Sequence, residues 1–235
     1  MSCLINNSSV PPNCRFEIDD AEDEWTFTQK FDFIHGRILV SCFSDPASVI
    51  AKAFDALIPG GYLEMQDIII PMKYVGKVPI DSALYKWNVY IIEASTKAQR
   101  PWTNVKNYPQ YFRDAGFEDI QEFKYLWPNL WLKKGRYFKT LARYFQANFH
   151  NGLEGLTMRL FTNFLGWPRE DVQSFVTAVK KDLQDPSIQT YIQVYVLFFL
   201  EADVVIDNLS DLSYMEGNRR VSADILTVPR NYEVH

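Results

Sequence analysis

The chain has 235 residues, of which 47% are hydrophobic and 15% aromatic, and its formal net charge is −5. The acidic balance, without a basic run, argues against a nucleic-acid partner, and no apolar stretch approaches the ~20 residues that a membrane-spanning helix needs. The start has no signal-peptide pattern and the three cysteines have no metal-ligand spacing, so we expect a cytoplasmic protein with reduced thiols, no metal and no membrane partner.

The first half of the chain alternates short apolar strands with helices, which is typical of an α/β sheet. Period-two alternation and apolar runs predict strands over residues 14–19, 31–35, 62–70 and 119–125. Capping signals and helical periodicity predict helices over residues 47–57, 81–99 and 108–114. The first of these helices opens at Asp45 and Pro46, and the last one closes at Gly116.

Helical periodicity dominates the second half. Amphipathic helices are predicted over residues 133–148 and 152–165, another opens at residues 167–171, and residues 187–200 end in a β-rich apolar run. We therefore expect one domain over residues 1–235. Its parts are a flexible lead-in at 1–13, an α/β core at 14–125, a largely helical insertion at 126–186, a last strand at 187–203 and a C-terminal extension at 204–235.

Several fragments, in chain order, resemble one known family. They are residues 12–25 (PNCRFEIDDAEDEW), 31–37 (FDFIHGR), 57–64 (LIPGGYLE), 115–120 (AGFEDI), 152–155 (GLEG) and 165–167 (LGW). Together they are similar to the fungal LaeA-like branch of the class I S-adenosylmethionine-dependent methyltransferases. The resemblance implies a Rossmann-like methyltransferase fold with a largely helical insertion. Because the first match corresponds to the family's third strand, it also implies a fold truncated on its N-terminal side.

The family's cofactor contacts are only partly matched. In the family, a glycine-rich turn after the first strand wraps the methionine half of the cofactor, and an acid ending the second strand binds the ribose. Here no glycine precedes residue 14, and none of the ten glycines forms a G-x-G pattern. The resemblance leaves Asp20 and Ala21 as vestigial adenine contacts. We therefore expect a lone protomer to use no cofactor, and S-adenosylmethionine to bind only if another chain completes the site.

Several polar and aromatic residues are candidates for the active site. His35, at the carboxyl end of a strand, and Asp67 are the expected proton-transfer residues, with a structural role for each left open. Arg37 is expected to pair with an acid such as Glu64 or, alternatively, to bind an anionic substrate. Further substrate contacts, with core packing as the alternative, are expected from Gln66, Tyr85, Tyr90, Trp127, Asn129 and Trp131.

The resemblance and the departures from it lead to three functional hypotheses. The first is an enzyme of fungal-type secondary metabolism that works without S-adenosylmethionine. It would catalyse a cyclisation or isomerisation of a polyketide- or terpenoid-like small molecule, in a site suited to apolar or aromatic compounds. The second is a genuine methyltransferase, completed by another chain or shortened in the sequence. The third is a non-catalytic partner subunit of a full-length methyltransferase.

The same truncation leads to a prediction about assembly. In the parent fold, the strand matched by residues 31–35 pairs with the first strand, whose loss leaves an apolar sheet edge. That edge carries Phe31, Phe33 and Ile34 and no Lys or Pro to discourage pairing. We expect an intimate homodimer to cover it, burying more than roughly 2,000 Å² in total, with the tail after residue 203 wrapped around its partner.

Overall fold

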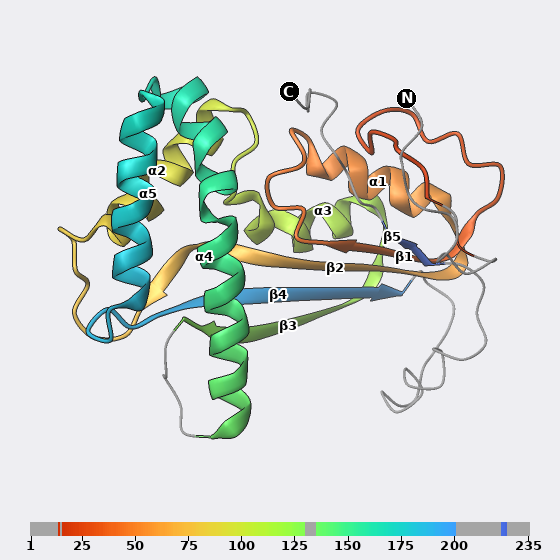
Figure 1. The fold of residues 1–235 in the computed structure, drawn as a ribbon. Helices are drawn as coiled ribbons and strands as arrows, with labels where there is room; N and C mark the ends of the chain where they lie inside the picture. Colours follow the sequence, from red (N-terminus) through yellow and green to blue (C-terminus); the bar gives the residue numbers. More distant parts are fainter. Residues whose placement is uncertain (1–13, 15, 130–134, 201–221, 225–235) are drawn as a thin grey trace. The chain divides into compact units, whose positions relative to one another are not determined.

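The computed structural model describes residues 14, 16–129, 135–200 and 222–224 (Figure 1). Its strands are β1 (Phe31–Arg37), β2 (Leu57–Tyr74), β3 (Glu118–Pro128), β4 (Thr190–Leu200) and β5 (Ser222–Asp224). Its helices are α1 (Pro46–Ala56), α2 (Ala83–Lys97), α3 (Tyr108–Ala115), α4 (Arg136–Leu165) and α5 (Arg169–Gln184), with a 3-10 turn η2 at Asn104–Asn107. The strands form one sheet in the order β3-β4-β2-β1-β5, so the α/β fold class expected from the sequence is confirmed.

The chain folds into two compact units, each built from separated stretches. The first unit comprises Met1–Gln66, Asn107–Glu122 and Val196–His235, and the second comprises Asp67–Lys106 and Phe123–Tyr195. Strands β1 and β5 and helices α1 and α3 belong to the first unit, and helices α2, α4 and α5 belong to the second. Strands β2, β3 and β4 each contribute residues to both units.

In the first unit, helix α1 begins where the sequence predicts it. The Asp45 side chain accepts a hydrogen bond from Ser48 N at 3.1 Å, and Pro46 occupies the first turn, where its missing N–H is not needed. The carboxylate of Glu22 accepts from Ser44 N at 2.7 Å and from Asp45 N at 3.0 Å. The segment before β1 is thereby anchored to the start of α1.

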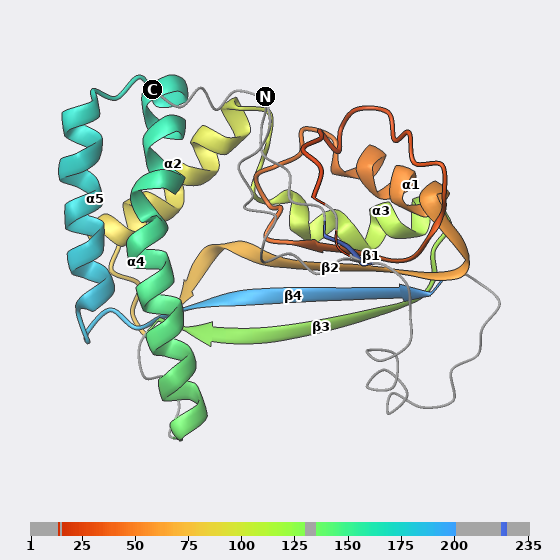
Figure 2. The same ribbon diagram turned by 45° about the vertical axis from the view of Figure 1, so that its right-hand side comes forward.

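One face of β1 and β2 forms the core of the first unit. The two strands pair in parallel, with Ile34 beside Leu63, and these side chains are 0% and 1% exposed. Figures 1 and 2 show α1 and α3 on the same face of β1 and β2. Helix α3 ends, as predicted, at Gly116, whose φ of 102° suits a residue without a side chain.

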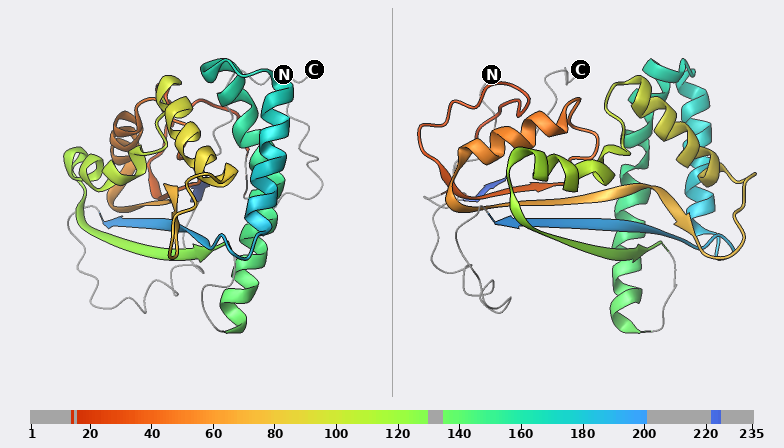
Figure 3. Two further views of the ribbon diagram at one scale, coloured as in Figure 1. Left: turned by 90° about the vertical axis from the view of Figure 1, so that its left-hand side faces the viewer. Right: turned by 180° about the vertical axis from the view of Figure 1, so that it is seen from behind.

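The second unit is a group of three helices, α2, α4 and α5, which lie side by side (Figure 3). Leu84, Trp87 and Ile91 of α2 follow one another at helical spacing and are each 0% exposed. The indole Nε1 of Trp87 donates to Thr157 Oγ1 of α4 at 2.8 Å. Further edge-to-face contacts join Trp87 to Phe149, and Trp167 to Tyr90, Phe161 and Phe175, so these rings serve packing within the unit.

Three predictions about single elements are wrong. Among the described residues of this range, 14 and 16–19, none is in a strand, since alternating side chains such as Ile18, at 66% exposure, find no face to bury against. The two helices expected over residues 133–148 and 152–165 are one continuous helix, α4. The buried face of α4 continues through Phe149, Leu153 and Thr157. The burial of these side chains stabilises the helix by more than the low helix propensity of Gly152 destabilises it.

The prediction of an unpaired edge at residues 31–35 is also wrong. Strand β5 pairs in parallel with β1, with Ser222 beside Phe33 and Asp224 beside His35. A short strand of the same chain therefore hydrogen-bonds to the edge that we expected a second protomer to cover. Among the helices of the described residues, none is both long and apolar enough to cross a membrane.

Candidate functional site

A chain of three hydrogen-bonded side chains lies on β1 and β2 in the first unit. His35 Nδ1 and Glu64 Oε2 are 2.6 Å apart, and the Gln66 amide donates to Glu64 Oε1 at 2.7 Å. Glu64 is buried, with its side chain 9% exposed, whereas the His35 side chain is 17% exposed. The carboxylate thus has one partner on each oxygen, and the imidazole reaches solvent.

Strand alternation and the parallel register bring these side chains together. Successive residues of a strand point to opposite faces, so His35 lies on the face opposite to Ile34, away from the core beneath α1. In the register of β1 and β2, His35 is next to Glu64, and Arg37 is next to Gln66. Alternation also puts Glu64 and Gln66 on one face of β2, which agrees with the hydrogen bond between them.

The geometry assigns a role to each nitrogen of His35. A carboxylate only accepts hydrogen bonds, so the close approach of Glu64 requires the proton on Nδ1. In the neutral imidazole Nε2 is then the acceptor. No described residue makes a hydrogen bond to Nε2, so this atom is available to a substrate proton. The arrangement is that of a base oriented by a carboxylate.

The predicted pairing of Arg37 with Glu64 is wrong. Glu64 is occupied by His35 and Gln66, and Arg37 is exposed and makes no ion pair within the described part of the chain. The next residue, Ile38, has a φ of 53°, which is an uncommon conformation for a β-branched side chain. Its N–H donates to Gln66 O at 2.8 Å, which fixes the turn that follows β1. The alternative role of Arg37, anion binding, stays a prediction.

The acidic turn expected beside an adenine contains several hydrogen bonds. The Asp20 carboxylate accepts from Glu22 N at 3.0 Å, Asp20 O accepts from Asp23 N at 2.9 Å, and the Trp25 indole donates to Ala21 O at 3.0 Å. Ala21 is buried. The cofactor role of Asp20 and Ala21 stays a prediction, but their backbone is held in one conformation.

Glu22 is a residue that sequence analysis missed. Besides its bonds to Ser44 and Asp45, its backbone carbonyl accepts from Lys52 Nζ at 2.7 Å, so α1 holds the turn from two sides. Glu22 is one of several acids in a row, so the sequence does not indicate that its partner is Ser44, 22 residues away.

A cavity of about 440 Å³ lies nearby, between the segment before β1 and α1, and it includes none of the predicted site residues.

The remaining predicted site residues lie in the second unit. Asp67 is 1% exposed and its Oδ1 accepts from Ile68 N at 2.9 Å. Asn129 is also 1% exposed and donates through Nδ2 to Leu183 O, while its Oδ1 has no partner among the described residues. Trp127 packs edge-on against Phe145 at 6.3 Å. Trp131 lies outside the described residues.

Two tyrosines of the predicted site pack against other aromatic rings. Tyr90 contacts Phe161 and Trp167 in the core of the helices. Tyr85 lies 6.3 Å from Tyr74, ring centre to ring centre. Burial raises the pKa of Tyr74 to about 12, and the nearby Asp182 adds to this effect, while the hydrogen bond from Asn88 opposes it. Substrate contacts for these residues stay a prediction. Within the described ranges, no cluster of His, Cys, Asp and Glu side chains suits a metal ion.

Comparison with known proteins identifies related sequences. The profile of a family described as methyltransferase domain matches residues 4–122. Probable methyltransferase tdiE of Emericella nidulans is 34% identical over 186 residues, which are 77% of this chain and 57% of the relative. Methyltransferase pytC of Aspergillus terreus is 32% identical, with 76% of this chain and 55% of the relative covered. Secondary metabolism regulator LAE1 of Cochliobolus heterostrophus is 29% identical, with 82% and 64% covered.

These matches correct one expectation. The chain spans little more than half the length of the first two relatives. The expectation of no cofactor is wrong, because the matching profile and these relatives are those of methyltransferases, which need a methyl donor. That expectation depended on a glycine turn missing from 235 residues. Since a cofactor site is assembled from several chain segments, a pattern missing from one stretch does not report on the whole site.

Proposed function

This chain belongs to the methyltransferase domain family, and from that premise we propose that it takes part in the S-adenosylmethionine-dependent methylation of a small molecule in fungal secondary metabolism. The relatives named as methyltransferases and as a regulator of secondary metabolism support this proposal. The observation that carries its chemistry is the hydrogen-bonded chain of His35, Glu64 and Gln66, with His35 Nε2 directed away from the carboxylate.

The residues of this chain fit part of the cofactor. The turn at Asp20 and Ala21 has a backbone fixed by several hydrogen bonds, which suits a flat adenine ring beside it. No G-x-G pattern occurs in the 235 residues, so the close backbone contacts of a glycine turn have to come from residues outside this sequence. We therefore propose that a further segment or another chain completes the cofactor site.

The proposed reaction uses His35 as a general base. When bound, S-adenosylmethionine would supply the methyl group for transfer to an oxygen or nitrogen of the acceptor. His35 Nε2 takes the proton that this acceptor atom loses. Glu64 holds the ring through Nδ1 and stabilises the positive charge that the imidazole gains, and Gln66 keeps the carboxylate in place. An acceptor with an acidic group would in addition contact the exposed Arg37.

Transfer of tritium-labelled methyl groups tests the proposal. The full chain is incubated with labelled S-adenosylmethionine and an extract of a producing fungus, which supplies acceptors and any completing chain. We expect label in the small-molecule fraction, and a loss of at least about 100-fold on His35→Ala, as is usual for removal of a general base. His150→Ala is the matched control, because it removes the other histidine of the described residues, on α4.

Two outcomes would contradict the proposal. Absence of chain-dependent label transfer would remove the methyltransferase function and favour a regulatory role, which is the role named for the LAE1 relative that the chain resembles over 82% of its length. Full activity of His35→Ala would leave the function standing and remove His35 as its base.

A further inference from the structure

The first half of helix α4 carries an unusual distribution of charge. Residues 136–150 contain Arg136, Lys139 and Arg143 and no acidic residue, and the first acid of the helix is Glu154. This occurs in a chain whose formal net charge is −5. Arg136 and Arg143 are both exposed. A strongly positive stretch therefore faces solvent on an otherwise acidic protein.

Two exposed aromatic residues accompany these cations. Tyr137 is 72% exposed and Tyr144 is 74% exposed. They are seven residues apart, as are Arg136 and Arg143, so each pair lies two turns apart on one side of the helix. The opposite side of the helix is buried through Ala142, Phe145 and Phe149. We call Arg136, Tyr137, Arg143 and Tyr144 the basic face of α4.

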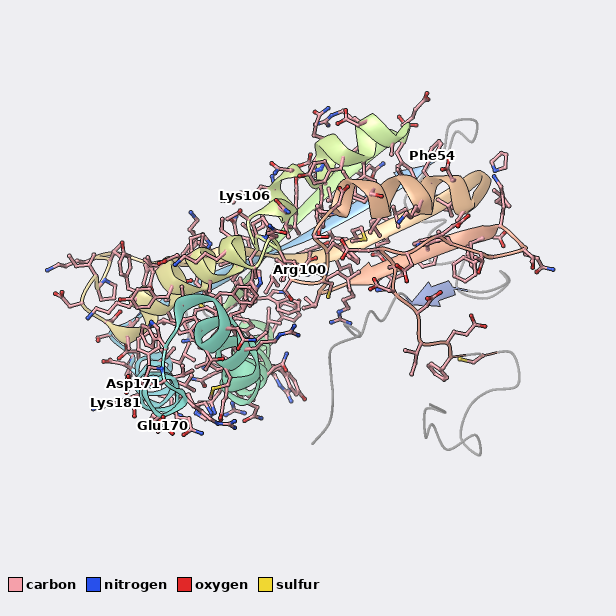
Figure 4. All side chains as sticks on the ribbon, turned by 90° about the horizontal axis from the view of Figure 1, so that it is seen from above. Phe54, Arg100, Lys106, Glu170, Asp171 and Lys181 are labelled. Carbon is pink, nitrogen blue, oxygen red and sulfur yellow. The ribbon has the colours of Figure 1, made fainter. Side chains whose placement is uncertain are left out.

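The placement of this charge disfavours the helix itself. The amino end of a helix is positive and is stabilised by acids, whereas α4 has no acid in its first turn and its N-cap, Gly135, makes no side-chain hydrogen bond. Helix α5 follows the usual pattern, with Glu170 and Asp171 in its first turn and Lys181 in its last (Figure 4). Helices α1, α2 and α3 also lack an acid in the first turn, so α4 is set apart by its exposed arginines and tyrosines and not by this absence.

We propose that the basic face of α4 binds an acidic, partly apolar peptide segment of a partner protein. Arg136 and Arg143 are about 10.5 Å apart along the helix axis. Carboxylates three residues apart on a peptide in the polyproline II conformation lie on one side of it, about 9.3 Å apart, so two of them can meet the two arginines. Each guanidinium can bind a carboxylate with two hydrogen bonds. The rings of Tyr137 and Tyr144 offer apolar area to the residues between the acids.

Charge complementarity favours such a peptide over a nucleic acid. A phosphate backbone carries charge along its whole length, and most of it would face a protein surface of net charge −5. A peptide with two acids matches the two arginines of the face and leaves no unpaired charge. The apolar contact with the tyrosines further favours a peptide with bulky side chains.

Fluorescence anisotropy at low salt tests this proposal. The probe is a labelled peptide with a single Glu-Leu-Phe-Glu segment between uncharged residues, and its competitors are the same peptide with Gln for Glu, a single-stranded DNA and phosphatidylserine vesicles. We expect the acidic peptide to bind. The double change Arg136→Glu and Arg143→Glu is expected to weaken it at least tenfold, and Tyr137→Ala with Tyr144→Ala several-fold. Arg159→Glu, the same substitution at one exposed site on the same helix outside the face, is the control for each of the single changes Arg136→Glu and Arg143→Glu.

Thermal unfolding keeps this test independent of folding. Arg136→Glu places an acid in the first turn of α4, so it should not lower the melting temperature even though it weakens binding. The proposal is overturned if the wild-type chain does not bind the peptide or if Arg159→Glu weakens it equally. It is also overturned if DNA or the vesicles displace the peptide more effectively than unlabelled peptide does. None of these results depends on methyl transfer.

Discussion

Glu64 determines which nitrogen of His35 carries the proton, so its charge matters more than its shape. In Glu64→Gln, the amide can occupy the same space and still meet His35 and Gln66, but it no longer requires the proton on Nδ1 or stabilises a charged ring. We expect kcat for methyl transfer to fall about tenfold to 100-fold with KM nearly unchanged. A raised KM with an unchanged kcat would show instead that Glu64 serves substrate binding and not proton transfer.

The raised pKa of Tyr74 predicts a loss of stability at alkaline pH. Its folded-state pKa is about 12, above the ordinary value near 10, so the unfolded chain loses this proton first as pH rises. Stability is therefore unaffected below pH ~10 and falls between pH ~10 and ~12, by about 1 kcal/mol after allowing for the partial exposure of the ring. Urea unfolding at both pH values measures the effect.

Tyr74→Phe is the comparison for this prediction. The substitution removes the hydrogen bond that Asn88 Nδ2 donates to the hydroxyl, so its stability at neutral pH is expected to be slightly lower. Its free energy of unfolding should nevertheless decline less steeply than that of the wild type above pH ~10. Parallel declines of the two proteins would mean that other groups titrate in place of Tyr74.

At the scale of single elements, much of the fold follows from local chemistry. The N-cap at Asp45 with Pro46 places the start of α1, and Gly116 places the end of α3, because each satisfies a backbone requirement that neighbours in the sequence can supply. The prediction of a strand over residues 14–19 was wrong, because a strand also needs a neighbouring strand to pair with. Likewise, strand alternation alone puts Glu64 and Gln66 on one face of β2.

The register between strands was not predictable from one sequence. It sets Glu64 beside His35 and Arg37 beside Gln66, and a different register would have allowed the expected ion pair of Arg37 with Glu64. The hydrogen bonds of the Glu22 carboxylate to Ser44 and Asp45, which we call the Glu22 clamp, were missed for the same reason. They join segments 22 residues apart through side-chain geometry. The family resemblance was read correctly, because short motifs in chain order do not depend on such contacts.

The clamp on α1 leads to a prediction at this scale. Glu22→Ala removes the acceptor for Ser44 N, Ser44 Oγ and Asp45 N, so the free energy of unfolding should fall by about 1–2 kcal/mol. The acidic turn at Asp20 should loosen as well, and we expect weaker binding of S-adenosylmethionine by the completed site. Glu24→Ala, an exposed acid two residues away, is the control. Equal stability of the two variants would contradict the role of the clamp.

For the whole molecule, the pairing of β5 with β1 changes the basis of the assembly prediction. The expected homodimer depended on an open apolar edge at residues 31–35, and β5 pairs along Phe33 to His35 of that edge. A homodimer stays a prediction, but it now needs either another surface or an exchange of β5 between protomers. Sedimentation of the full chain at micromolar concentration measures this directly.

Removal of β5 is expected to expose the edge. A chain ending at residue 221 lacks Ser222–Asp224, so Phe33, Ile34 and His35 of β1 lose their backbone partners next to the apolar side chains that favour strand pairing. We expect this variant to self-associate with increasing concentration and to show more β-sheet signal as it does. A chain ending at residue 224 keeps β5 and is the control, expected to sediment like the full chain.

If both shortened chains sediment alike, β5 does not protect the edge. If instead the full chain is a dimer and the chain ending at 221 is a folded monomer, β5 is exchanged between protomers, and the edge of β1 is the dimer interface after all.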